Sequence, residues 1–166
     1  MKTKTLGYFL LFCFIASNSF ANTPKSSGKY KNWESFTLTT DKGKVCFAQT
    51  KPVKRAPAAI KRNDSRIFVT FRPSENIKDE ISITSGHAYK NSTVSAKSGK
   101  SNFSFFSQGD FAWLLDENEE KKFIKLMKRA TDLMIKGKTK DVAETTDHYS
   151  MMGFTKAYNT AKKVCN

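Results

Sequence analysis

The sequence IFVTF at residues 67–71, followed by ISIT at residues 81–84, determines the fold class. Successive side chains of a strand point to opposite faces, so the first, third and fifth residues of such a run share one apolar face. Strands also favour β-branched and aromatic residues. Residues 73–76 begin with a proline and supply a turn, and Gly86 ends the second run. We therefore predict two short strands separated by a turn.

The same pattern continues on both sides of these strands. Before them, residues 33–40 and 44–48 flank the turn Asp41-Lys42-Gly43, which predicts a hairpin. After them, further strands are expected at residues 92–97, 103–105, 111–115, 133–135 and 145–151. Short strands at a spacing of about ten residues are typical of an antiparallel sandwich or barrel.

Two helices are expected near the C-terminus. From Asp116 onward, four acidic residues precede five basic ones, which complements the dipole of a helix. Phe123, Met127 and Ala130 are spaced so that they fall on one face, which predicts an amphipathic helix packed on the sheet. A last short helix begins at Gly153-Phe154. The chain is therefore expected to be mainly β, with one or two short surface helices.

Residues 1–21 are typical of a cleavable secretory signal. Two lysines precede the apolar run Leu6–Ala16, and Ser19-Phe20-Ala21 places small residues at the positions required for a cut after Ala21. The eleven residues of the run are too few to span a bilayer, which needs about 20. We predict an exported protein, periplasmic or secreted, with residues 22–31 as a flexible lead-in and residues 32–166 as a single domain.

Export determines how many cysteines the mature chain keeps and whether they are expected to form a disulfide. Cleavage after Ala21 leaves two of them, Cys46 and Cys165. In an oxidising compartment an even pair favours a disulfide, with two buried thiols as the alternative. A bridge that closes a loop of more than about 100 residues stabilises the fold by roughly 4–5 kcal/mol in the chain-entropy model. We predict a Cys46–Cys165 disulfide that fixes the C-terminal segment to the first strands.

The chain is strongly basic. Its formal net charge is +14, and the two lysines of residues 1–21, which hold no acid, leave 14 − 2 = +12 for the rest. A mean hydropathy of −0.53 excludes a multi-span membrane protein, and 13% aromatic residues argue against wholesale disorder. The loop Lys51–Arg66 contains two prolines, which disfavour a helix or a central strand, so its basic side chains are expected in solvent. These are Lys51, Lys54, Arg55, Lys61 and Arg62.

Three interpretations of this charge are open. Anionic lipid headgroups or lipopolysaccharide fit an exported protein best, and Lys97 with Lys100 extends the candidate patch. Charge alone also favours nucleic acid, but export argues against it as the physiological partner. Alternatively, the charge serves only solubility.

Catalysis has one candidate cluster, Asp147, His148 and Ser150, which suggests a small periplasmic hydrolase as the alternative function. In a strand, Asp147 points away from the other two, no Gly-x-Ser-x-Gly elbow surrounds a serine, and Tyr149 is expected to pack inward. His87 and His148 are the only histidines and have no ligand partners at metal spacing. Without a Gly-rich phosphate loop, we expect no cofactor and no enzyme.

The segment DHYSMMGFTKA at residues 147–157 is the most distinctive motif of the chain. It is accompanied by Trp33, Cys46, Ala112-Trp113, Met127-Lys128, Gly137 and Cys165. Together these residues resemble the invasion-associated locus B family of exported bacterial proteins, over nearly all of residues 30–166. Two places depart from the family pattern: residues 141–144 replace a usual Gly-Thr, and Ala130 or Thr131 stands where the family tends to have Gly.

The resemblance implies an immunoglobulin-like antiparallel β-sandwich, a periplasmic or envelope location and a loosely defined link to host-cell invasion. It implies no catalytic or cofactor residues. We therefore expect an exported, non-enzymatic envelope protein that acts through surface contacts with an anionic envelope component or a protein partner.

Overall fold

The computed structural model describes residues 23–91 and 94–166. The predicted signal segment lies outside the described residues, as do the first two residues of the strand expected at 92–97. The described strands are β1 (Lys25–Tyr30), β2 (Trp33–Thr40), β3 (Gly43–Thr50), β4 (Lys54–Ala56), β5 (Arg66–Arg72), β6 (Ile77–Thr84), β7 (Val94–Ser98), β8 (Ser101–Gln108), β9 (Phe111–Trp113), β10 (Asp132–Lys138) and β11 (Glu144–Ser150). The α-helices are α1 (Glu117–Arg129) and α2 (Phe154–Cys165), and a 3₁₀ turn spans Pro73–Glu75. The prediction of a mainly β chain with two late helices is confirmed.

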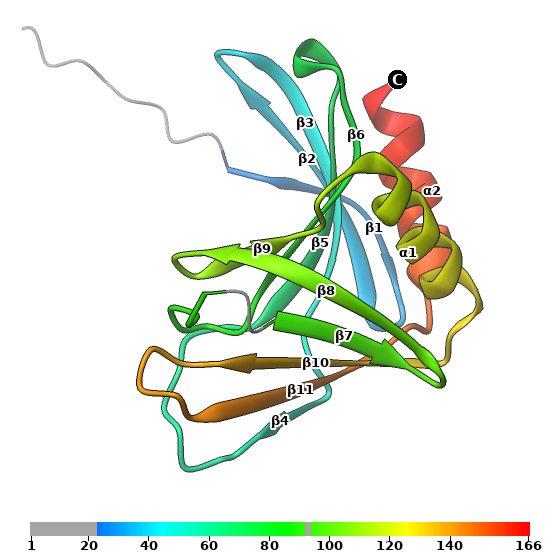
Figure 1. Cartoon of the computed structure of the whole chain (residues 1–166). Coiled ribbons are helices and arrows are strands. Elements are labelled where there is room, and N and C mark those ends of the chain that lie inside the picture. Colours follow the sequence, from blue (N-terminus) through cyan, green and yellow to red (C-terminus); the bar gives the residue numbers. More distant parts are fainter. Residues whose placement is uncertain (1–22, 92–93) are drawn as a thin grey trace, which may run out of the picture.

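All eleven strands belong to one antiparallel sheet, in the order β1-β2-β3-β5-β6-β9-β8-β7-β10-β11-β4. The sheet folds over, so that the strands of its two halves cross steeply (Figure 1). Strand β8 makes the bend, since its first residues pair with β7 and its last three with β9. Continuous hydrogen bonding therefore joins the described strands into one sheet with two halves.

The two helices cover the inner face of the folded sheet. Helix α2 packs on the first half, where Phe154 contacts Trp33 with ring centroids 4.8 Å apart. Helix α1 inserts Phe123 between Phe103 and Phe105, at centroid distances of 5.0 and 5.5 Å. Trp33, Phe105, Phe123 and Phe154 belong to one core cluster, so both helices and both halves of the sheet share a single core.

The start of each helix has a local cause. The Asp116 carboxylate accepts hydrogen bonds from the backbone N–H groups of Asn118 and Glu119, which is a normal N-cap. Gly153 precedes α2 at φ 100°, with the backbone of Tyr30 packed where a side chain would lie. Any larger residue at 153 would clash with that backbone.

Cys46 in β3 and Cys165 at the end of α2 form a disulfide, with their Cα atoms 5.6 Å apart. The bridge joins residues 119 positions apart and holds the C-terminal helix on the first half of the sheet. The predicted pairing is confirmed.

Two segments differ from the sequence prediction. Lys25–Tyr30, expected within a flexible lead-in, forms β1 and pairs with β2, and the Tyr30 hydroxyl lies 2.8 Å from Thr160 Oγ1. The sequence of β1 is mostly polar and has no apolar pattern that would predict a strand. This edge strand is held mainly by backbone hydrogen bonds. Lys54–Ala56, expected in a loop, forms β4, which sits at the other edge where flanking prolines are tolerated.

The part of the chain that the structure describes contains no helix that could span a bilayer.

Candidate anionic-surface interface

The five basic residues predicted in the Lys51–Arg66 loop separate into two groups. Lys51, Lys54 and Lys61 are exposed, as expected. Arg55 is half-buried, and the Arg62 side chain is only 2% exposed. The prediction that all five project into solvent is therefore wrong for Arg62 and only partly right for Arg55.

The burial of Arg62 is explained by Asp147, a buried carboxylate that requires a positively charged partner. Asp147 points to the inner face of β11 and is fully buried, and an unpaired buried carboxylate is strongly unfavourable. The Arg62 guanidinium donates to both carboxylate oxygens, at 2.6 and 2.9 Å, and also to the Ser85 carbonyl at 3.0 Å. Arg55 Nε lies 3.9 Å from the same carboxylate. The loop thus folds back onto the sheet to neutralise Asp147.

Two tyrosines border this ion pair. The Tyr89 hydroxyl donates to Ser85 Oγ at 2.8 Å, whereas the buried Tyr149 Oη has no hydrogen-bond partner among the described residues. Burial raises the pKa of Tyr149 well above its ordinary value, and the nearby Asp147 charge adds to the effect. The predicted inward packing of Tyr149 is confirmed, and the cluster as a whole is a buried polar network between loop and sheet.

The structure does not bring the hydrolase candidates together. Asp147 lies on the inner face of β11, while His148 and Ser150 lie on the outer face. Ser150 Oγ accepts a hydrogen bond from the Met152 N–H at 3.2 Å. Among residues 23–91 and 94–166, no group of three or more His, Cys, Asp or Glu side chains is placed to hold a metal.

The outer face of the second half of the sheet carries aligned basic residues. Across neighbouring strands, Lys97 lies opposite Met134, Met134 opposite His148, and His148 opposite Lys54. In the adjacent row Lys136 lies between Ser95 and Thr146. We name this surface the basic face and define it by its five basic residues: Lys54, Lys97, Lys136, Lys138 and His148.

The sequence prediction missed Lys136 and Lys138. The signal was present, because these lysines alternate with the buried Ile135 and Gly137 of the same strand. What the sequence lacked was the pairing of β10 with β7 and β11, which sets Lys97, Lys136 and Lys54 on one surface.

Acidic neighbours neutralise little of this charge. Lys54 and Lys97 have no ion-pair partner in the part of the chain that the structure describes, and Lys136 pairs with the half-exposed Glu144 at 3.0 Å. Lys51 pairs with Asp64 at 2.9 Å, and hydrogen bonds from Lys51 and Arg66 lower the pKa of Asp64. Such exposed pairs contribute little to stability, so Lys51 and Lys136 can exchange these partners for other anions.

No family model, curated protein or solved structure matches this chain.

Proposed function

We propose that this chain is an exported, non-enzymatic envelope protein that binds anionic lipid headgroups through the basic face. We also propose that the chain is a member of the invasion-associated locus B family, which it resembles, and that it has the immunoglobulin-like sandwich that this family implies. Residues 1–21 are removed on export. Anionic lipid headgroups carry the charge opposite to that of the protein, and they are present in the compartment where an exported protein resides.

The main support for this function is the cross-strand alignment of Lys97, His148 and Lys54, with Lys136 in the next row. A sheet holds these side chains on one surface, so several of them reach an anionic surface together. Each lysine near such a surface contributes about 1 kcal/mol, which supports peripheral association. Lipid phosphates, including those of lipopolysaccharide, supply the anionic groups.

Two observations support export. The layout of residues 1–21 is that of a secretory signal. The Cys46–Cys165 disulfide is a bond that persists in oxidising compartments and is rare in reducing ones.

Co-sedimentation with vesicles tests the proposal. Vesicles containing phosphatidylglycerol should bind the protein at low salt, more weakly at physiological salt, and neutral digalactosyl-diacylglycerol vesicles should not. The combined change of Lys54, Lys97 and Lys136 to Gln should lower the affinity for anionic vesicles at least tenfold.

The matched control removes the same charge elsewhere. Lys25, Lys29 and Lys42 are exposed lysines on the first half of the sheet or its turns, and their combined change to Gln should alter the affinity less than about threefold. Equal loss in the two triple variants would mean that only the net charge matters. Equal binding to neutral vesicles would also contradict the proposal.

A further inference from the structure

A separate hollow lies where the sheet opens between β6 and β9. These strands pair only through Ser82 with Trp113 and Ile83 with Ala112, after which the chain leaves β9 and turns into α1. The resulting space has a volume of about 360 Å³, within the usual range for small-ligand sites. It is lined by Glu80, Phe106, Gln108, Trp113, Leu114, Leu115 and Glu120.

One wall of the hollow is aromatic. The Trp113 and Phe106 rings are stacked at 27°, with centroids 5.7 Å apart, and the Phe111 ring, two residues before Trp113 in the same strand, lies 5.9 Å from it. Phe106 is 41% exposed and Leu115 is 79% exposed. Exposed apolar groups gathered at one hollow are typical of a binding surface rather than of a solvated one.

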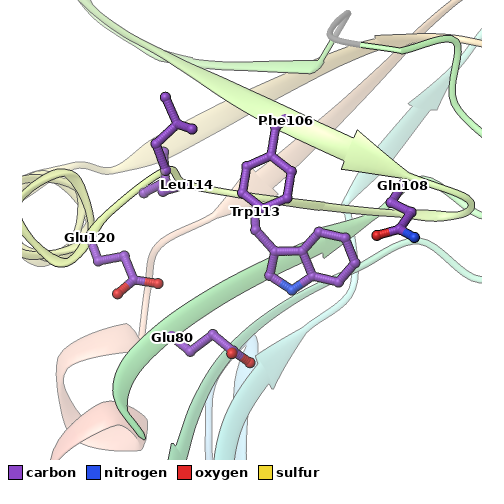
Figure 2. Close-up of a pocket in the computed structure, with 7 residues that line it drawn as sticks. Glu80, Phe106, Gln108, Trp113, Leu114 and Glu120 are labelled. Atoms are coloured by element: carbon purple, nitrogen blue, oxygen red, sulfur yellow. The ribbon is translucent and has the colours of Figure 1, made fainter.

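The opposite wall is acidic. Figure 2 shows the Glu80 and Glu120 carboxylates, from β6 and α1, on the side of the hollow facing away from Phe106. Arg72 already neutralises Glu80, with contacts of 2.9 and 3.1 Å. Glu120 accepts a hydrogen bond from the Ile81 N–H at 3.1 Å but has no ion-pair partner among the described residues. The Glu120 carboxylate on this acidic wall is therefore left without a cation, in a chain with an excess of lysines.

The surroundings of Glu120 make its negative charge unfavourable. Burial raises its pKa to about 7, and the nearby charges of Glu80, Asp79 and Glu117 act in the same direction. The charged groups around it are Lys78, Asp79 and Glu80 from β6, with Arg72 of β5 behind Glu80, and Glu117 and Lys121 from α1. The Lys121 side chain pairs with Glu117 at 3.3 Å and not with Glu120.

We propose that this hollow binds an organic ammonium ion, with the cation beside Glu120 and against the Trp113 ring. Trp is the strongest cation–π partner among the side chains, and a desolvated cation gains most from such a ring. A carboxylate without a cation supplies the opposite charge. The aromatic and leucine side chains offer contact to the alkyl groups of the ligand and no ligand atoms to a bare metal ion.

Two sources carry this chemistry: a quaternary ammonium such as the choline headgroup, and the primary ammonium of a lysine side chain. Both are small enough for the hollow, and both place a positive charge among carbon atoms. The test therefore uses choline and Nα-acetyl-lysine amide as separate probes.

The two tryptophans allow a direct measurement on the ¹⁵N-labelled full chain. Trp113 lines the hollow, whereas Trp33 is fully buried and its indole N–H donates to the Ser150 carbonyl at 3.0 Å. Titration at constant ionic strength should shift the Trp113 indole signal with a saturable, millimolar dissociation constant and leave the Trp33 signal unchanged. The probe that binds more tightly identifies the source of the ammonium group.

The neutral isostere 3,3-dimethyl-1-butanol, which has the shape of choline without its charge, should bind at least fivefold more weakly. Equal binding of choline and this isostere would overturn the proposal, because the hollow would then be only an apolar site. Absence of a Trp113 shift with both ammonium probes, or equal shifts of Trp33 and Trp113, would overturn it as well.

Glu120→Gln keeps an oxygen acceptor for the Ile81 N–H and removes the charge, so it should weaken ammonium binding at least fivefold. Glu119→Gln is the matched control on the same helix, since Glu119 pairs with Lys122 at 2.8 Å outside the hollow. The ionised fraction of a group of pKa about 7 rises from about one tenth at pH 6 to about nine tenths at pH 8. Affinity should rise about tenfold over this range in the unaltered chain and stay constant in Glu120→Gln; an unchanged affinity in Glu120→Gln at pH 8 would overturn the proposal.

Discussion

Arg62 and Asp147 form a bidentate ion pair that is closed to solvent, with side chains 2% and 0% exposed. The pair joins the loop after β4 to the middle of β11, across 85 positions of sequence. Because Arg62 also donates to the Ser85 carbonyl, it fixes three segments at one point. The charge pattern of the sequence predicts Arg62 to be part of a surface that binds anions, whereas in the structure Arg62 has a structural role.

Removing one partner of this pair should be strongly destabilising. Arg62→Ala or Asp147→Ala leaves an uncompensated buried charge, with an expected loss of about 3–5 kcal/mol in the free energy of unfolding. Urea unfolding measures this loss. Replacing both residues by apolar ones, Arg62→Met with Asp147→Leu, should recover a large part of it.

The exposed pair Glu119–Lys122 on α1 provides the control for that prediction. Its removal should cost no more than about 0.5 kcal/mol, as expected for a surface pair on a helix. A loss below about 1 kcal/mol for Asp147→Ala would show that the carboxylate is hydrated in solution.

Tyr89 and Tyr149, the two tyrosines beside the buried ion pair, should respond differently to loss of the hydroxyl group. Tyr89→Phe breaks the hydrogen bond to Ser85 and should lower the free energy of unfolding by about 1 kcal/mol. Tyr149→Phe removes a buried hydroxyl that has no partner among the described residues, so stability should stay equal or rise by up to about 1 kcal/mol. Thermal or urea unfolding of both variants gives the comparison, and a clear loss in Tyr149→Phe would contradict it.

The disulfide should carry much of the stability of the C-terminal helix. Changing both Cys46 and Cys165 to Ser should lower the free energy of unfolding by roughly 2–5 kcal/mol. Hydrogen exchange should then show α2 losing protection before the central strands. Non-reducing mass spectrometry of the exported protein must find no free thiol, since two free thiols would disprove the bridge.

Glu120 should make stability fall as the pH rises. Its folded pKa of about 7 lies above the ordinary value of 4.5, so between these values the folded state binds more protons than the unfolded state. The free energy of unfolding therefore decreases from about pH 4.5 to about pH 7, by about 1–2 kcal/mol once solvent screening of this half-buried group is allowed for. Urea unfolding at pH 5 and pH 8 should show this decrease in the unaltered chain but not in Glu120→Gln. An identical pH dependence in the two proteins would contradict the assignment.

The parts of the fold that follow from local pattern were predictable. The runs at 67–71 and 81–84 became β5 and β6, and the charge order after Asp116 became α1. Lys25–Tyr30 and Lys54–Ala56 were not predicted as strands, because edge strands are held by backbone hydrogen bonds and need no apolar pattern.

The candidate sites depended on tertiary pairing that the sequence does not display. A basic loop predicts exposed charge, and nothing local to Arg62 indicates that Asp147 would be buried beside it. Likewise, Lys54, Lys97 and Lys136 form one surface only because β7, β10, β11 and β4 are neighbours in the sheet.

The most direct test of the proposed function is to map which surface contacts the lipid. Paramagnetic lipids in phosphatidylglycerol nanodiscs broaden the backbone amide signals of residues that lie near the headgroups. The strongest broadening should fall on Lys54, Lys97, Lys136 and their strand neighbours, should fade at high salt, and should spare β1 and α2. Strongest broadening on β1 or α2, or an even distribution over the whole surface, would contradict binding through the basic face.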